Sequence, residues 1–293
     1  LSLAQCTAMT LAASGAAVPV GLALEQADGT RFRFDTAVFP DGHPDAAANL
    51  LFLERTVKFL LWSRGGFRLS VAAPDALVDG LRRHFAQTAS GRFDAEIMGT
   101  RIYEKPFEVV GCPASDLPEA RETTQPLGRH LKGCRIGFDL GASDRKVAAV
   151  IDGRVVFSEE TPWHPVVQTD PQWHFDQIMH SLKRGAAHLP RVDAIGGSSA
   201  GVIVNNRIKV ASLFRGVPRE LFDTRVKDLF LEIKQAWNGI PFDVVNDGEV
   251  TALAGAMSIG ENSLLGVAMG SSEAAGYVTP EGNITSWLNE LAF

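Results

Sequence analysis

Three short apolar segments joined by two tight turns follow one another between residues 135 and 159. The first segment, RIGFDL, is followed by a turn of small residues behind Asp139, and KVAAVI and RVVFSE come next. The last two segments meet at Asp152-Gly153, a dipeptide that suits the positive φ angles of a two-residue hairpin. This stretch therefore predicts a three-stranded antiparallel meander that opens a domain.

Helices and strands alternate after this meander. One apolar stripe with helical spacing runs through residues 172–189, and a second runs from Phe222 to Trp237. The other expected elements are, in chain order, a strand at 192–197, a hairpin at 201–212 that turns at Asn205-Asn206, a strand at 242–247, a helix at 249–257, a strand at 263–269 and a hairpin at 276–284. This alternation predicts a mixed α/β sheet whose first three strands are antiparallel and whose faces are covered by helices.

Residues 113–134 are polar, rich in turn formers and free of apolar periodicity, which is typical of a linker. The expected elements before it are strands at 19–25, 31–39 and 67–74 and helices at 45–63 and 75–87. We therefore predict a smaller N-terminal α/β domain of unknown role at 1–112, followed by the linker and the domain that the meander opens.

Composition narrows the classes of partner. The 293 residues carry a net charge of −6, which would repel a polyanion, so nucleic acid is not the expected partner. No stretch approaches the ~20 apolar residues of a membrane helix. The 3 cysteines, Cys6, Cys112 and Cys134, are widely spaced and form no C-x-x-C pair. This argues against a disulfide framework and against a cysteine zinc site, and it favours the cytoplasm.

Three turns have the same pattern, in which small and polar residues lie at the carboxyl end of an apolar strand. They follow Asp139, Val245 and Met269. Small residues let backbone N–H groups approach phosphate oxygens closely, and hydroxyl groups add donors. A carboxylate there would repel phosphate unless it faced a hydrated Mg²⁺. Each turn taken singly is also consistent with an ordinary junction between a strand and a loop.

The order of these motifs resembles the actin, Hsp70 and sugar-kinase superfamily, and within it the ROK family of sugar kinases and repressors. The resemblance rests on the turn at 139–144, on Asn246-Asp247 before an alanine-rich helix, and on the small-residue turn at 270–274. Ala200-Gly201 stands where the family carries Pro-Gly. The resemblance implies an actin-like ATPase (ribonuclease H-like) fold, with a first lobe at 135–260 and the start of a second lobe at 261–293.

The resemblance also implies roles on the sugar side of the site. Asp247 would be the general base that takes the proton from a sugar hydroxyl, and Asn246 would fix the neighbouring hydroxyls. Ser199 and Gly201 would line the sugar pocket. Glu290, in a segment that resembles the family's Gly-Glu-x-Gly-His, would accept hydrogen bonds from the sugar.

On the nucleotide side, the resemblance implies ATP and Mg²⁺ as cofactors, with Asp139 holding Mg²⁺ through water. The residues implied to line the phosphates are Gly141, Ala142, Ser143, Gly270 and Ser271. Asp144 and Glu273 depart from the family pattern, because they add negative charge where phosphates would lie. The family's cysteine-rich zinc motif is absent, so no zinc is expected. Only 159 residues remain from Arg135 onward, so the second lobe is expected to be incomplete.

Three functions follow, in order of preference. The first is an ATP-dependent carbohydrate kinase. The second is a non-catalytic sugar-binding or regulatory protein on the same fold, favoured by Asp144 and Glu273. The third is a sugar-responsive repressor, which would need a basic recognition helix that residues 1–130 do not show. The sequence names neither the sugar nor its phosphorylated hydroxyl, and it leaves a homodimer open.

Overall fold

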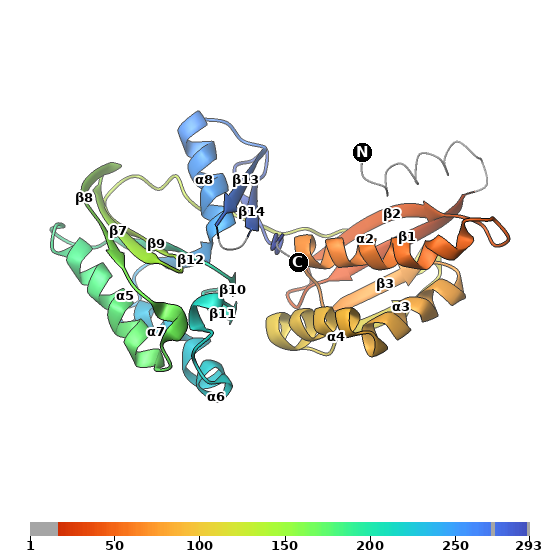
Figure 1. The fold of residues 1–293 in the computed structure, drawn as a ribbon. Coiled ribbons are helices and arrows are strands. Elements are labelled where there is room, and N and C mark those ends of the chain that lie inside the picture. The colour runs from red at the N-terminus through yellow and green to blue at the C-terminus, as the bar shows by residue number, and fades with distance from the viewer. Residues whose placement is uncertain (1–16, 271–272, 292–293) are drawn as a thin grey trace. The chain divides into compact units, whose positions relative to one another are not determined.

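The structure is a computed structural model that describes residues 17–270 and 273–291 (Figure 1). The described chain divides into two compact units. Unit 1 comprises residues up to 125 together with 285–291, and unit 2 comprises 126–284. Within the described residues, no helix combines the length and the apolar composition that crossing a membrane requires.

The sheet of unit 1 has the order β2-β1-β3-β4. Strand β1 pairs antiparallel with both β2 and β3, and β3 pairs parallel with β4. The strands span Val18–Glu25 (β1), Arg31–Val38 (β2), Arg68–Ala72 (β3) and Glu108–Gly111 (β4). The central strand β1 is buried on both faces, so it needs apolar side chains at consecutive positions rather than an alternating pattern.

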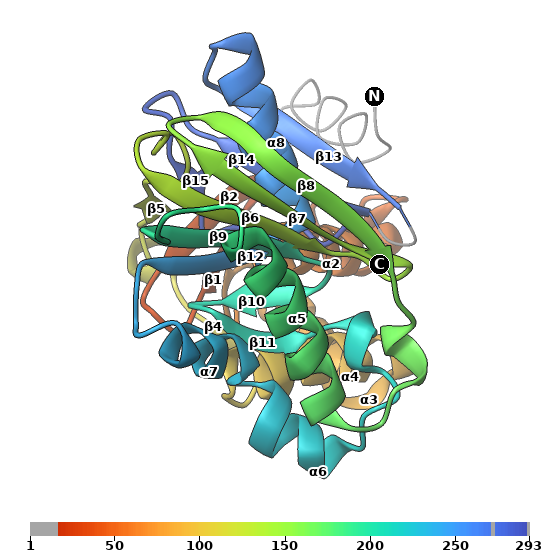
Figure 2. The same ribbon diagram turned by 90° about the vertical axis from the view of Figure 1, so that its left-hand side faces the viewer.

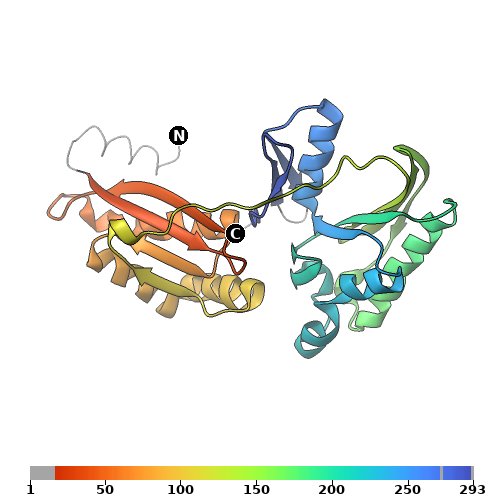
Figure 3. The ribbon, with the colours of Figure 1, turned by 180° about the vertical axis from the view of Figure 1, so that it is seen from behind.

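Helices cover one face of this sheet (Figures 1 and 3). They are α2 (Asn49–Arg64), α3 (Asp75–Gln87), α4 (Ala89–Ala95) and the wider π-type turn η2 (Glu96–Tyr103). The predicted α2 and α3 are present, but α4, η2 and β4 were not predicted. Thr88 is both the C-cap of α3 and the N-cap of α4. Its Oγ1 accepts a hydrogen bond from the Gly91 N–H at 3.0 Å, which caps α4.

A buried ion pair joins α2 to α4. Lys58 Nζ lies 2.8 Å and 3.0 Å from the two carboxylate oxygens of Asp94, and Trp62 Nε1 donates to Oδ1 of the same carboxylate at 2.9 Å. The Asp94 side chain is fully buried. Its negative charge is therefore compensated inside the unit.

Residues 285–291 cover the carboxyl end of α2. The backbone N–H groups of Asn289 and Glu290 donate to the carbonyls of Ser63 and Trp62, at 3.0 Å and 3.1 Å. The guanidinium of Arg64 lies 3.3 Å from the ring centre of Trp287. These contacts satisfy carbonyl groups that a helix end leaves without intrahelical partners. The segment is thus part of unit 1 although it follows unit 2 in the chain.

Unit 2 is built on a five-stranded sheet with the order β12-β9-β6-β7-β8 (Figure 2). The strands are β6 (Cys134–Leu140), β7 (Asp144–Ile151), β8 (Arg154–Pro162), β9 (Ala194–Ser199) and β12 (Phe242–Asn246). The first three are antiparallel, whereas β9 runs parallel to β6, and β12 runs parallel to β9. The predicted fold class, a mixed sheet domain preceded by a smaller α/β domain, is confirmed.

The two faces of this sheet differ in their side chains. One face is covered by α5 (Pro171–Ala186) and α7 (Leu229–Ala236), which bury the apolar residues that alternate along the strands, such as Ile136 and Phe138. On the opposite face, β6 and β9 present Gly137 and Gly196 side by side, and a Cβ added to either would meet no atom within 4 Å. This second face is the more open one.

The predicted helix through Phe222–Trp237 is interrupted. The structure has a short α6 (Arg219–Leu221), a π-type turn η6 (Phe222–Val226) and then α7. The carbonyl of Lys227 accepts a hydrogen bond from the N–H of Ile208 on β11 at 3.0 Å. Because that carbonyl serves the hairpin of β10 (Val202–Val204) and β11 (Arg207–Val210), the helix is broken there.

Helix α8 (Asp247–Ile259) packs on a second small sheet that contains β13 (Leu264–Met269), β14 (Glu273–Val278) and β15 (Ile284–Thr285). The packing is close because glycines face the helix. A Cβ on Gly266 would lie 2.4 Å from the Ala252 nitrogen, and one on Gly276 would lie 2.5 Å from the Glu249 Cα. Glycine is therefore required at both positions for α8 to approach the hairpin.

Candidate functional site

The carboxyl ends of the three parallel strands meet at one edge of the unit 2 sheet. Asp139 on β6 pairs with Ser198 on β9, and Val245 on β12 pairs with the same serine. Asp247 follows β12 directly and begins α8. Parallel strands of an open α/β sheet place ligands at this edge. The sheet thus brings Asp139 and the start of α8 to the same edge.

The carboxylate of Asp139 is contacted on both oxygens. The hydroxyl of Ser198 donates a hydrogen bond to Oδ1, and Lys146 Nζ lies 3.5 Å from Oδ2. Lys146 is the cross-strand partner of Asp139 in the β6–β7 ladder. The ammonium also binds Asp144 Oδ1, and these acidic neighbours raise the pKa of Lys146. Lys146 is therefore a cation at neutral pH.

The turn between β6 and β7 is fixed by its own hydrogen bonds. The Gly141 N–H donates to the carbonyl of Asp144 at 3.0 Å, and Trp163 Nε1 donates to the carbonyl of Gly141 at 2.8 Å. The Trp163 N–H donates to the carbonyl of Ser143, also at 3.0 Å. Ala142 and Ser143 remain exposed at the tip. These hydrogen bonds therefore fix the backbone conformation of the turn that was predicted to hold phosphates.

Asp144 does not carry an isolated negative charge. Its carboxylate accepts hydrogen bonds from Lys146 and from the Ser143 hydroxyl, the latter at 2.8 Å. Both bonds stabilise the ionised form and lower the pKa of Asp144. The negative charge of Asp144 is thus compensated by Lys146.

Asn246 caps helix α8. Its Oδ1 accepts the Gly248 N–H at 2.8 Å. Its side chain also accepts the Glu249 N–H, and the Glu249 carboxylate accepts the Asn246 N–H at 3.0 Å, and these two bonds make a capping box. Its Nδ2 donates to the carbonyl of Gly201 at 2.8 Å. Gly201 has a φ of +116°, and a Cβ there would lie 2.4 Å from the Val210 carbonyl oxygen. In the structure the Asn246 amide therefore positions the start of α8.

Asp247 is the titratable group at this helix start. Burial raises the pKa of Asp247 to about 6, the negative charge of Asp139 adds to the increase, and Lys146 opposes it. Its Oδ1 is buried and has no hydrogen-bond partner within the described residues. A carboxylate whose pKa lies near neutrality, and which has an unused acceptor, has the properties of a general base.

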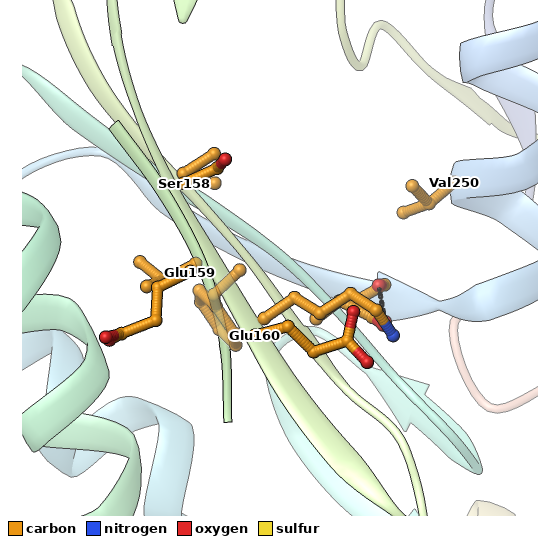
Figure 4. A pocket seen from close by; sticks show the side chains of 11 residues that line it. Ser158, Glu159, Glu160 and Val250 are labelled. Atoms are coloured by element: carbon orange, nitrogen blue, oxygen red, sulfur yellow. Dashed lines mark hydrogen bonds and ion pairs between the residues drawn. The ribbon is translucent and has the colours of Figure 1, made fainter. Parts of the chain in front are cut away.

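A cavity of about 490 Å³ lies on the open face of the sheet, and its lining includes Asp139 and Lys146 but not Asp247. Figure 4 shows Glu160 pointing along this face and Glu159 pointing to the other side of β8, while Val250 approaches from α8. Glu159 accepts two hydrogen bonds from Arg184 on α5. The residues that line the cavity are Gly137, Phe138, Asp139, Lys146, Val147, Ala148, Ser158, Glu159, Glu160, Ser198 and Val250.

The other predicted site residues have different environments. Ser199 is fully buried, and its hydroxyl has no hydrogen-bond partner within the described residues. Gly270 is exposed at the end of β13, whereas Ser271 lies outside the described residues. Glu290 belongs to unit 1, on the segment that covers the end of α2. Glu273 begins β14 and is exposed.

Lys146 and Ser198 are contributors that the sequence pattern did not single out. The sequence could have indicated Lys146. Side chains alternate between the two faces of a strand, and this alternation, followed back along β7 from the β7–β8 turn, places Lys146 on the same face as Asp139. Ser198 carries no such signal in the sequence alone, since its contact with Asp139 depends on the register of two distant strands.

The described residues contain no group of three or more His, Cys, Asp or Glu side chains arranged to hold a metal ion. Mg²⁺ does not require such a group, because it commonly binds one or two carboxylates, water and substrate phosphates. Asp139 could supply one such carboxylate, but Lys146 already lies beside it. The residues therefore fit Mg²⁺ that arrives with phosphates better than a resident metal.

Several solved structures are similar to this chain. A putative N-acetylmannosamine kinase from Listeria monocytogenes is 17% identical over 51% of this chain and 48% of its own, with a TM-score of 0.40. The ROK hexokinase from Thermus thermophilus is 18% identical over 52% and 47%, at the same TM-score of 0.40. A ROK family transcriptional regulator, a homologue of the E. coli MLC protein, is 16% identical over 75% and 50%, also at 0.40.

The chain spans about half the length of these structures. No protein-family model matches its sequence. No curated protein matches it either.

Proposed function

We propose that this chain carries the first lobe of a ROK-like sugar kinase, which transfers the γ-phosphate of ATP to a hydroxyl group of a sugar. The observation that carries the proposal is Asp247, a carboxyl group with a raised pKa whose Oδ1 has no hydrogen-bond partner among the residues that the structure describes, at the sheet edge that also bears Asp139. The motif resemblance over residues 135–293 supplies the reaction class.

In this proposal Asp247 accepts the proton of the sugar hydroxyl while the sugar oxygen attacks the γ-phosphorus and ADP leaves. The capping box formed by Asn246 and Glu249 holds the backbone of Asp247 in place. The hydrogen bonds of Asn246 support a positioning role for its amide, alongside the predicted contact with sugar hydroxyls.

The nucleotide is proposed to bind at the turn 141–143 and at the turn that contains Gly270. Mg²⁺ bound to ATP supplies positive charge to the phosphoryl group during transfer. Asp139 is the carboxylate placed to face that ion, and Lys146 is placed to contact phosphate oxygens. The proposal retains a cytoplasmic location, with Cys112 and Cys134 as free thiols.

A non-catalytic sugar-binding protein is the second candidate. The observation that favours it is the chain of contacts from Asp144 through Lys146 to Asp139, which uses the groups expected to meet phosphates and metal. In this alternative the sugar binds and nucleotide does not.

Calorimetric titration of the 293-residue chain with MgATP and with a panel of hexoses separates the two candidates. Binding of both supports a kinase, and binding of sugar alone supports the second candidate. Asp247→Asn should then retain sugar affinity and lower phosphorylation by ~10²–10⁴. Asp243→Asn, an exposed carboxylate on β12, the strand that precedes Asp247, is the matched control. A parent chain that phosphorylates a sugar, with Asp247→Asn fully active, would remove Asp247 from the mechanism.

A further inference from the structure

Lys146 occupies the centre of a group of carboxylates on the open face of the unit 2 sheet. It lies directly opposite Asp139 in the β6–β7 ladder and directly opposite Glu160 in the β7–β8 ladder. Its ammonium lies 3.5 Å from Asp139 Oδ2 and also binds Asp144. Adjacent strands place directly opposite residues on the same face, so this arrangement is fixed by the register of the sheet.

Among the residues that line the cavity in the described part of the chain, Lys146 is the one cation, and Asp139, Glu159 and Glu160 are the anions. Glu159 is paired with Arg184, so its charge is compensated elsewhere. The ammonium of Lys146 is therefore the counter-ion of the remaining carboxylates on this face.

We propose that Lys146 is a tethered counter-ion which takes the position of a metal ion beside Asp139, so that the protein without nucleotide binds no divalent cation there. A metal ion that coordinates Asp139 would have to displace the ammonium or lie beside it, and like charges at such short distances repel strongly. Mg²⁺ would then enter only together with phosphate groups, which give Lys146 another anionic partner.

The inference uses the proposed function in one respect, the assignment of Asp139 as the carboxylate that faces a metal. Its test needs neither sugar nor ATP. A failure of sugar phosphorylation would leave the test unaffected, and a failure of the test would leave Asp247 as the proposed base.

The experiment measures binding of Mn²⁺ alone to the full chain by the loss of the electron paramagnetic resonance signal of free Mn²⁺. The parent should show no saturable site at millimolar Mn²⁺. Lys146→Met retains most of the apolar stem and removes the charge, so it should show one saturable Mn²⁺ site, with a dissociation constant at least ~10-fold below the highest Mn²⁺ concentration at which the parent shows none. Lys183→Met, an exposed lysine on α5, is the control and should behave like the parent.

The double variant Asp139→Asn with Lys146→Met should lose the gained site, because the amide is a weaker ligand than the carboxylate. If Lys146→Met changes the circular dichroism spectrum, Lys146→Gln replaces it. The proposal is overturned if the parent binds Mn²⁺ at a site that Asp139→Asn removes. It is equally overturned if a folded Lys146 variant gains no Mn²⁺ site.

Discussion

The side-chain amide of Asn246 donates a hydrogen bond to the backbone carbonyl of Gly201, 45 residues earlier in the chain, at 2.8 Å. The same side chain caps α8 through its Oδ1. One residue thus ties the start of the helix that carries Asp247 to the loop after β9. The contact adds to the parallel pairing of β9 and β12, which brings these two segments together.

Replacement of Asn246 should therefore destabilise unit 2. Asn246→Ala removes the helix cap and leaves the Gly201 carbonyl without its amide donor, so we expect a loss of about 1–3 kcal/mol in unfolding free energy. Asn246→Ser keeps a cap acceptor without adding charge and loses the amide donor, so its loss should be smaller. Urea denaturation followed by circular dichroism measures both. Equal stability of Asn246→Ala and the parent would contradict the structural role.

Glu249 should make stability depend on pH. Burial raises the pKa of Glu249 from 4.5 to about 7, and the hydrogen bond from Asn246 only partly offsets this. The native state therefore binds its proton more tightly than the unfolded state does. The stabilising contribution is complete below pH 4.5 and is lost as the pH rises through 7.

Glu249→Gln should remove this dependence, because the amide stays neutral and its oxygen can still accept the Asn246 N–H. The unfolding free energy of the variant, relative to that of the parent, should rise by about 2–3 kcal/mol between pH 4.5 and pH 7. Unfolding free energies measured across the range provide the check. Parallel curves for the two proteins would show that Glu249 is ionised in the native state.

The pKa of Asp247 predicts the acidic limb of activity. A general base is active when it is deprotonated, so phosphorylation should fall as the pH drops below about 6. The positive charge of Lys146 lowers the pKa of Asp247. Lys146→Met should therefore raise the pKa of Asp247 in the metal-free protein, whereas a control at exposed Lys183 should leave that pKa unchanged; a nuclear magnetic resonance titration of the Asp247 carboxyl carbon measures both. An Asp247 pKa that is equal in the two variants would indicate that the charge of Lys146 does not act on this group.

One crowded glycine and one uncrowded glycine together test the packing of α8 against β14. A Cβ on Gly276 would lie 2.5 Å from the Glu249 Cα, so Gly276→Ala should destabilise the protein by about 1–3 kcal/mol. A Cβ on Gly137 meets no atom within 4 Å. Gly137→Ala should be neutral or stabilising by up to about 1 kcal/mol, because alanine loses less entropy on folding. Similar thermal shifts for both variants would contradict the close approach of α8 to β14.

In unit 1, removal of Lys58 should leave a buried charge without its ion-pair partner. Lys58→Met is expected to lower the unfolding free energy by about 3–5 kcal/mol, because Asp94 stays buried. The double variant Lys58→Met with Asp94→Asn should recover part of that loss. Guanidinium denaturation of the single and double variants measures the coupling. A double variant no more stable than Lys58→Met would show that the uncompensated charge of Asp94 is not the main cause of the destabilisation.

Local pattern predicted the elements where one face of a strand or helix is buried. The meander β6–β7–β8 was predictable because Ile136 and Phe138 alternate with small or polar residues, and the turn at Asp152-Gly153 has the expected composition. The helix at 222–237 was predicted as continuous because its apolar stripe is continuous. Its interruption at Lys227 depends on β11, which lies elsewhere in the sequence.

The candidate site shows the same division. Asn246 and Glu249 have the three-residue spacing of a capping box, whereas the family resemblance implied only a sugar-binding role for Asn246. The pairing of Asp144 with Lys146 was also missed, because Asp144 was considered by its charge alone. Residue type thus indicated which groups gather at the sheet edge, whereas their partners depended on strand register.

The attachment of residues 285–291 to unit 1 gives the chain an unusual connectivity. The polypeptide leaves unit 1 after Gln125, builds unit 2 and returns to cover the end of α2. Unit 2 is therefore an insertion within unit 1, and two connections join them. A single proteolytic cut between residues 126 and 133 would leave the fragments joined through Asn289, Glu290 and Trp287, so they should separate on a denaturing gel and migrate together on a native one.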